Sequence, residues 1–142
     1  MKKIISISLF LMSFTVLANV DAFLGTYKAK DGDGKAVVTK KIVTERTLFE
    51  PETYEYQVDI EREKDEISRS LILKPNSTNT ALLGETSDDC DNPDCHAFDL
   101  LEVEIKQLKG KAQLKLSYEG YNTYDGEDTV EKFNGEALFL KK

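Results

Sequence analysis

The sequence predicts an all-β fold, a small antiparallel meander of about eight strands that closes into a barrel. Apolar and polar residues alternate in several segments, most regularly over 54–61, 101–106 and 112–118. A period of two is typical of an antiparallel strand that packs one face on a core and exposes the other to water. Short turn signals separate these segments, and beyond residue 22 no stretch has the spacing of an amphipathic helix.

The alternation also predicts which side chains face the core. The expected inward residues are Tyr54, Tyr56, Val58, Ile60, Val103, Ile105, Leu114, Leu116 and Tyr118. The expected solvent-facing residues are Glu55, Gln57, Asp59, Lys115 and Ser117. A register slip of one residue would bury all of these polar groups at once, so the assignment holds or fails for a whole strand.

Eight candidate strands follow one another with short connections, which favours an up-and-down order. They span 23–29, 36–44, 54–61, 67–73, 80–84, 101–106, 112–118 and 130–140. Turn signals separate them at 31–34, 50–51, 75–76, 109–110 and 124–126, and the charged segments 61–66 and 85–94 are expected to be exposed connections. Closure removes exposed sheet edges, so we favour a barrel over the alternative, a two-sheet sandwich. Gly135 in the last segment predicts a bulge or tight bend.

The beginning of the chain has the pattern of a cleavable export signal. Two lysines precede the uncharged apolar run 4–17, which is too short to cross a bilayer comfortably. We expect cleavage after Ala18, with cleavage after Ala22 as the alternative. The predicted organisation is a signal peptide, 1–18, and a single β-barrel-like domain, 19–142. This organisation predicts a secreted or periplasmic protein with no membrane span after signal removal.

The charge balance excludes several classes of partner. The full chain carries a net charge of −7, and removal of the two signal lysines takes it to −9. A strongly acidic protein is poorly suited to nucleic acid, which is bound through clustered Lys and Arg, or to an anionic membrane surface. The balance suits a basic partner protein, or serves solubility alone.

Cys90 and Cys95 are the two cysteines, and an even count in an exported chain predicts a disulfide. The closed loop is short, so the bond is expected to hold a local loop rather than the whole fold. A zinc site formed with the adjacent His96 is the rival interpretation. We expect no cofactor, but the surrounding loop is also rich in carboxylates, which leaves calcium as a second alternative. Its candidate ligands are Asp88, Asp89, Asp91 and Asp94, although they lack EF-hand spacing.

No residue pattern in the chain predicts catalysis. His96 is the single histidine and is expected to lie on a surface loop, and Glu102 and Glu104 are interpreted as the solvated side of a strand. Nucleophile-elbow, phosphate-loop and zinc-helix motifs are absent from the sequence. We therefore predict that the protein is not an enzyme.

Three tyrosines form the candidate binding site. Tyr118, Tyr121 and Tyr124 cluster at and beyond the end of a predicted strand, next to two glycines. Loops at one end of a barrel commonly bind ligands or partners, and Tyr is a frequent contact residue. The alternative is that these rings merely close the end of the barrel.

The segment 21–28, with Phe23, Gly25 and Tyr27, resembles the opening strand of the fatty-acid-binding proteins, which share a barrel superfamily with the lipocalins. The resemblance implies a lipocalin-like barrel. That family holds the ligand carboxylate with an Arg near the C-terminus and has a helix pair after the first strand. Here the last Arg is Arg69 and a second strand follows directly, so the resemblance does not imply fatty-acid binding.

These observations lead to three functional hypotheses. The first is an exported, non-enzymatic binding module that holds an apolar small molecule inside the barrel or a partner at its mouth. The second is an acidic inhibitor of a basic secreted enzyme of the lysozyme type, guided by charge steering. The third is an exported hydrolase. A hollow, apolar interior would favour a small molecule held inside the barrel, whereas a filled interior would favour recognition at the surface.

Overall fold

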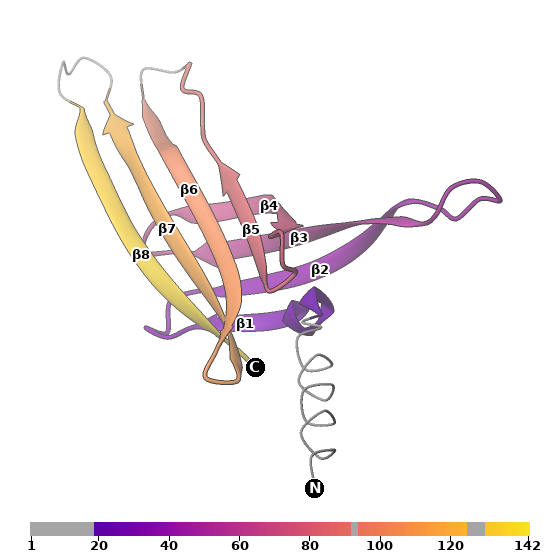
Figure 1. The fold of residues 1–142 in the computed structure, drawn as a ribbon. Coiled ribbons are helices and arrows are strands. Elements are labelled where there is room, and N and C mark those ends of the chain that lie inside the picture. Colours follow the sequence, from indigo (N-terminus) through magenta and orange to yellow (C-terminus); the bar gives the residue numbers. More distant parts are fainter. Residues whose placement is uncertain (1–18, 92–93, 125–129) are drawn as a thin grey trace, which may run out of the picture.

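The computed structural model describes residues 19–91, 94–124 and 130–142, so the predicted signal peptide and part of the turn signal at 124–126 lie outside the described residues. The described chain folds as a closed antiparallel β-barrel (Figure 1). A single turn of 3₁₀ helix, η1 (Val20–Phe23), precedes the strands. The strands are β1 (Gly25–Ala29), β2 (Lys35–Thr44), β3 (Thr53–Arg62), β4 (Ile67–Pro75), β5 (Ala81–Thr86), β6 (Cys95–Leu108), β7 (Lys111–Thr123) and β8 (Glu131–Lys141).

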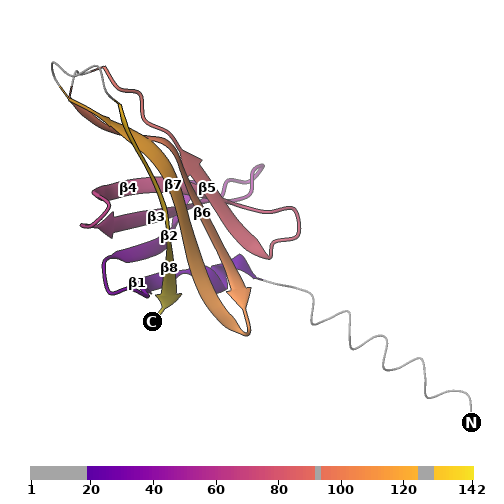
Figure 2. The same ribbon diagram turned by 90° about the vertical axis from the view of Figure 1, so that its left-hand side faces the viewer.

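Each strand pairs with its neighbours in the sequence, and β1 pairs with β8 to close the barrel. The predicted meander and its closure are therefore confirmed, and the sandwich alternative is wrong. The pairing of β4 with β5 is the shortest in the barrel, since only Lys74 and Pro75 of β4 pair with residues of β5. β1–β4 cross β5–β8 steeply, and β6–β8 extend past β1–β4 at one end (Figures 1 and 2).

The interior is filled by one contiguous cluster of apolar side chains. Its largest fully buried members are Tyr27, Ile60, Ile67, Leu73, Leu82, Phe98, Leu101, Ile105, Leu114, Leu116, Val38 and Phe139. The predicted alternation is confirmed in β3, β6 and β7. Val58, Val103 and Leu116 are at most 2% exposed, whereas Asp59 and Lys115 are exposed.

The structure corrects three details of the sequence analysis. Tyr54 is 46% exposed, because it lies where β3 has run beyond the barrel. The β6–β7 hairpin is several residues longer than the alternation predicted. Gly135 makes no bulge, since β7 and β8 pair in continuous register there. Its missing side chain instead leaves room for Tyr118, whose hydroxyl a Cβ at this position would overlap.

Within the described residues, no helix is long and apolar enough to cross a membrane.

Candidate functional site

We call the barrel end that carries the β1–β2 and β3–β4 hairpins the loop end, and the opposite end, which carries η1, the helix end. Arg62 closes the loop end with a side chain that is only 4% exposed. Its guanidinium donates to both carboxylate oxygens of Asp31 (3.2 and 3.0 Å), to Asp65 (2.7 Å) and to the carbonyl oxygen of Asp33 (2.7 Å). The hydrogen bonds from Arg62 are the main reason why the pKa of Asp31 falls to about 2.

A second charged pair lies beside the aromatic side chains of the loop end. Arg69 donates to Asp88 (2.8 Å), and the same carboxylate oxygen accepts the backbone N–H of Phe98 (3.0 Å). Burial opposes ionisation of Asp88, but these two donors hold the pKa of its carboxyl below its usual range. The guanidinium of Arg69 also lies 5.6 Å from the centre of the Phe98 ring. The connection after β5 is therefore tied across the mouth of the barrel.

His96 was expected on a surface loop, and that expectation is wrong. It lies on β6, where its ring stacks on Phe133 at 4.7 Å between centres and meets Phe98 edge-on at 5.1 Å. Its Nδ1 is 2.6 Å from the side-chain oxygen of Asn122, and its Nε2 is buried without a hydrogen-bond partner among the described residues. The same Nδ1 lies 3.4 Å from a carboxylate oxygen of Glu66, whose side chain is exposed. His96 therefore belongs to the packing of the loop end.

Cys90 and Cys95 form the predicted disulfide, with their Cα atoms 6.3 Å apart. Both thiols are consumed by this bond, which removes them from the rival zinc site. The described residues contain no group of three or more His, Cys, Asp or Glu side chains arranged to hold a metal ion. The calcium hypothesis for Asp88, Asp89, Asp91 and Asp94 thus gains no support, and Asp88 is already engaged by Arg69 and Phe98.

The three candidate tyrosines do not form one surface. Tyr118 points into the barrel, half-buried, where it hydrogen-bonds Asp65 and lies edge-on to Phe98; burial is the main reason why its pKa rises to about 12. Tyr121 lies three residues along the same regular strand and so faces the other side of the sheet. Tyr124 follows the strand and donates to Glu131 at 3.2 Å.

The helix end is closed by η1, which the sequence analysis did not anticipate. Val20 and Phe23 are buried against the core, and the hydroxyl of Tyr27 donates to the carbonyl oxygen of Phe23 (2.8 Å). Asp21 accepts from Tyr56 (2.7 Å) and Lys40 (3.0 Å), and these two hydrogen bonds lower the pKa of its carboxyl.

Comparison with known proteins gives no family to which the chain can be assigned. No protein-family model, no curated protein and no solved structure matches it significantly. The site therefore has to be argued from this chain's own surface.

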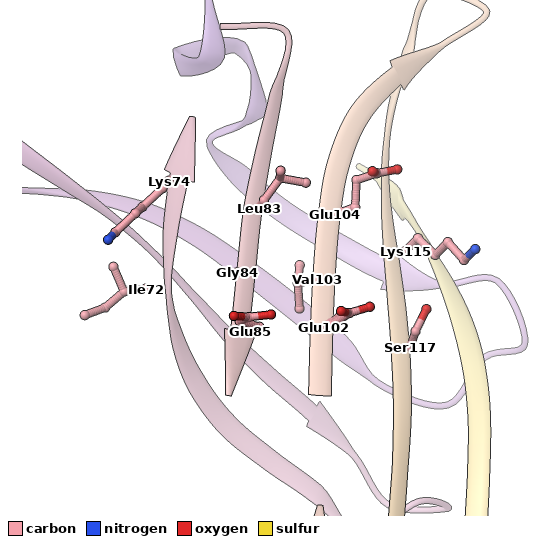
Figure 3. A pocket seen from close by; sticks show the side chains of 10 residues that line it. All are labelled: Ile72, Lys74, Leu83, Gly84, Glu85, Glu102, Val103, Glu104, Lys115 and Ser117. Carbon is pink, nitrogen blue, oxygen red and sulfur yellow. The ribbon is translucent and has the colours of Figure 1, made fainter. Parts of the chain in front are cut away.

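A groove of about 750 Å³ lies on the outer surface beside the short pairing of β4 with β5 (Figure 3). Ile72 and Leu83 provide its apolar part, and both are more than 40% exposed. Glu85 of β5 and Glu102 of β6 stand directly opposite each other across the strand pair. Like charges in this position repel each other, so a cation placed between them would be stabilised.

The lysines of the groove do not neutralise this pair. The amino groups of Lys74 and Lys115 point away from Glu85 and Glu102 (Figure 3), and Lys115 lies 3.4 Å from Glu136 instead. Neither glutamate forms an ion pair within the described residues.

The second surface feature is a projecting arm, the part of the β2–β3 hairpin that extends beyond the barrel over residues 39–55 (Figure 1). β1 stops pairing with β2 at Val38, and β4 begins to pair with β3 at Tyr56. The arm is therefore a two-stranded ribbon without further strand partners in the described structure. At its tip, Leu48 is 97% exposed and Phe49 is 95% exposed.

Sequence reasoning placed a turn at 50–51 but missed the arm. The apolar residues Leu48 and Phe49 next to this turn were the available signal, because turn tips are usually polar. The groove could not be seen either, since it depends on how β4 and β5 diverge.

Proposed function

We propose that this protein is an exported, non-enzymatic binding protein whose partner is a basic exported protein. The filled interior carries the proposal. The inward-facing side chains form one packed cluster, and both barrel ends are closed by side chains of the chain itself. This arrangement favours surface recognition over an apolar ligand held inside the barrel.

The charge of the outer surface supports a basic partner. Without the signal lysines the chain carries −9, and Glu85 and Glu102 stand uncompensated in the groove. A Lys or Arg side chain suits this groove, because its aliphatic stem can lie on Ile72 and Leu83 while its charged head meets the two carboxylates. Opposite net charges would also accelerate encounter at low ionic strength.

Inhibition of a basic enzyme of the lysozyme type is the more specific form of this proposal. The observation that favours it is the projecting arm, because a narrow ribbon can enter an active-site cleft that a barrel wall cannot reach. The disulfide is compatible with a secreted or periplasmic location, where oxidising conditions preserve such bonds.

Calorimetric titration with a basic lysozyme, a basic ribonuclease and cationic trypsin tests the proposal. We expect binding to at least one of them that weakens steeply as salt rises from low to physiological ionic strength. The double variant Glu85→Gln/Glu102→Gln should weaken it further than the matched control Glu61→Gln/Glu119→Gln, which removes the same charge from exposed positions outside the groove. Absence of binding to all three proteins at low salt would overturn the proposal.

A further inference from the structure

The tip of the arm exposes more apolar surface than any other described part of the chain. The other large apolar side chains on the surface are at most 61% exposed, and Leu108 (43%) and Leu140 (40%) keep more than half of their area covered. Leu48 and Phe49 keep almost none covered, although they are adjacent in the sequence. Isolated exposed apolar residues are ordinary, whereas a contiguous exposed group marks an interaction site.

The exposed group continues along the arm. Ile42 (55%), Val43 (61%) and Tyr54 (46%) are also exposed, and Ile42 pairs directly with Tyr54 across the ribbon. The apolar surface therefore extends from the tip toward the barrel on one element, rather than being scattered over several strands.

The structure holds the tip in a defined shape. Thr47 donates its backbone N–H to the carbonyl oxygen of Glu50 (3.0 Å), and the Thr47 hydroxyl oxygen accepts the backbone N–H of Glu50 (3.0 Å). At the base of the arm, Lys40 lies 4.1 Å from the centre of the Tyr54 ring and is bound to Asp21. A tip that is closed and an arm that is anchored reduce the entropy lost when a partner binds.

The charges around the tip identify the kind of partner. Segment 45–52 carries three glutamates and one arginine, so the apolar tip is surrounded by a net negative charge. Carboxylates beside the tip oppose insertion into a bilayer, and the charge of −9 opposes both an anionic membrane and a second copy of the chain. A pocket with an apolar floor and a rim of Lys or Arg satisfies both the tip and its glutamates.

We infer that Leu48 and Phe49 insert into an apolar pocket of the basic partner, while cations on the rim of that pocket pair with Glu45 and Glu50. This inference rests on the proposed function and adds the element that makes the central contact. A small number of buried apolar or aromatic anchors usually dominates such an interface. The acidic surface would bring the partner close, and the tip would hold it.

The test compares Leu48→Ser/Phe49→Ser with the control Leu108→Ser/Leu140→Ser, which removes two exposed apolar side chains from other elements. Each variant is titrated with whichever protein of the basic panel binds the wild type. We expect the tip variant to bind at least about tenfold more weakly and the control to change by less than about twofold. Circular dichroism should match the wild type for both variants, because neither pair belongs to the core.

The outcomes separate this inference from the function on which it rests. If the wild type binds none of the basic proteins, the proposed function is overturned and the inference falls with it. If the wild type binds and the tip variant binds equally well, the inference alone is wrong. Analytical ultracentrifugation that finds a dimer disrupted by the tip variant would assign the tip to a second copy. Co-sedimentation of the wild type, but not of the tip variant, with phosphatidylcholine–phosphatidylglycerol vesicles would assign it to a membrane.

Discussion

Replacement of Arg62 by Met should destabilise the protein by about 3 kcal/mol. Loss of one partner from a buried ion pair costs about 3–5 kcal/mol, because the opposing charge is left uncompensated. Here the side chains of Asp31, Asp33 and Asp65 are 47%, 23% and 21% exposed, so water can replace part of what Arg62 supplied. The value should therefore lie at the lower limit of that range. Met retains the apolar stem and keeps the change in packing small.

Urea titration of Arg62→Met and of the matched control Lys35→Met tests this magnitude. Lys35 lies on β2, and its amino group is 3.4 Å from Glu61 with both side chains more than 60% exposed. An exposed pair of this kind contributes at most about 1 kcal/mol. Equal losses of unfolding free energy in the two variants would show that Arg62 does not close the loop end as described.

The destabilisation should also depend on pH. The pKa of Asp31 is about 2 in the folded protein, well below its ordinary value of 3.8. A lowered pKa gives stability that is fully present above the unfolded value and is lost as the pH falls toward the folded value. The difference between wild type and Arg62→Met should therefore be largest above pH 4 and should shrink between about pH 4 and pH 2. A difference that stayed constant over this range would contradict the assigned pairing.

Three further predictions concern the core, the disulfide and the N-terminus. Leu116→Ala should destabilise by about 2–5 kcal/mol and Ser117→Ala by no more than about 0.5 kcal/mol in denaturant titrations, since only Leu116 faces the core; the reverse order would refute the register of β7. Reduction of the disulfide should lower stability by at most about 2 kcal/mol, and complete unfolding in reductant alone would show a larger role. Intact mass of the exported protein should give Asn19 as the first residue, because cleavage after Ala22 would remove Asp21 from Lys40 and Tyr56; a mass that begins at Phe23 would contradict this.

Alternation was sufficient to predict the fold because a regularly paired strand of a small barrel points every second side chain into the core. Val58 and Ile60 lie two positions apart on β3, and both are buried, as a strand period of two requires. The same argument failed at Tyr54, although the phase there is unchanged. Burial depends on whether neighbouring strands extend equally far, and sequence alternation carries no information about the ends of neighbouring strands.

β6 shows a different limit of the pattern. Phe98 and Leu101 are both fully buried, although side chains three residues apart on a regular strand face opposite sides of the sheet. The register of β6 against β7 shifts between Phe98 and Leu100, so the inward phase changes at this irregularity. The alternation identified 101–106 correctly but could not extend the strand backward through the shift. His96 was therefore assigned to a loop rather than to the aromatic packing of the loop end.

Charged residues in an inward phase are the sequence feature that would have located the ends of the barrel. Arg62 continues the phase of Val58 and Ile60, and Lys40 and Arg69 stand in the inward phases of β2 and β4. A cation in such a position must either remain in water or find a carboxylate from another element. All three do the latter, with Asp31, Asp21 and Asp88 respectively.

This pairing bears on where the protein acts. The three inward cations are neutralised at the two ends of the barrel, so the acidic surplus of the chain lies on its outward faces and connections. In the described residues the interior is packed with apolar side chains, whereas the groove exposes Glu85 and Glu102 and the tip of the arm exposes Leu48 and Phe49. Exposed apolar side chains are stabilised when a partner covers them, and two neighbouring carboxylates are stabilised when a partner places a cation between them. For that reason we propose that recognition takes place on the outside of this barrel.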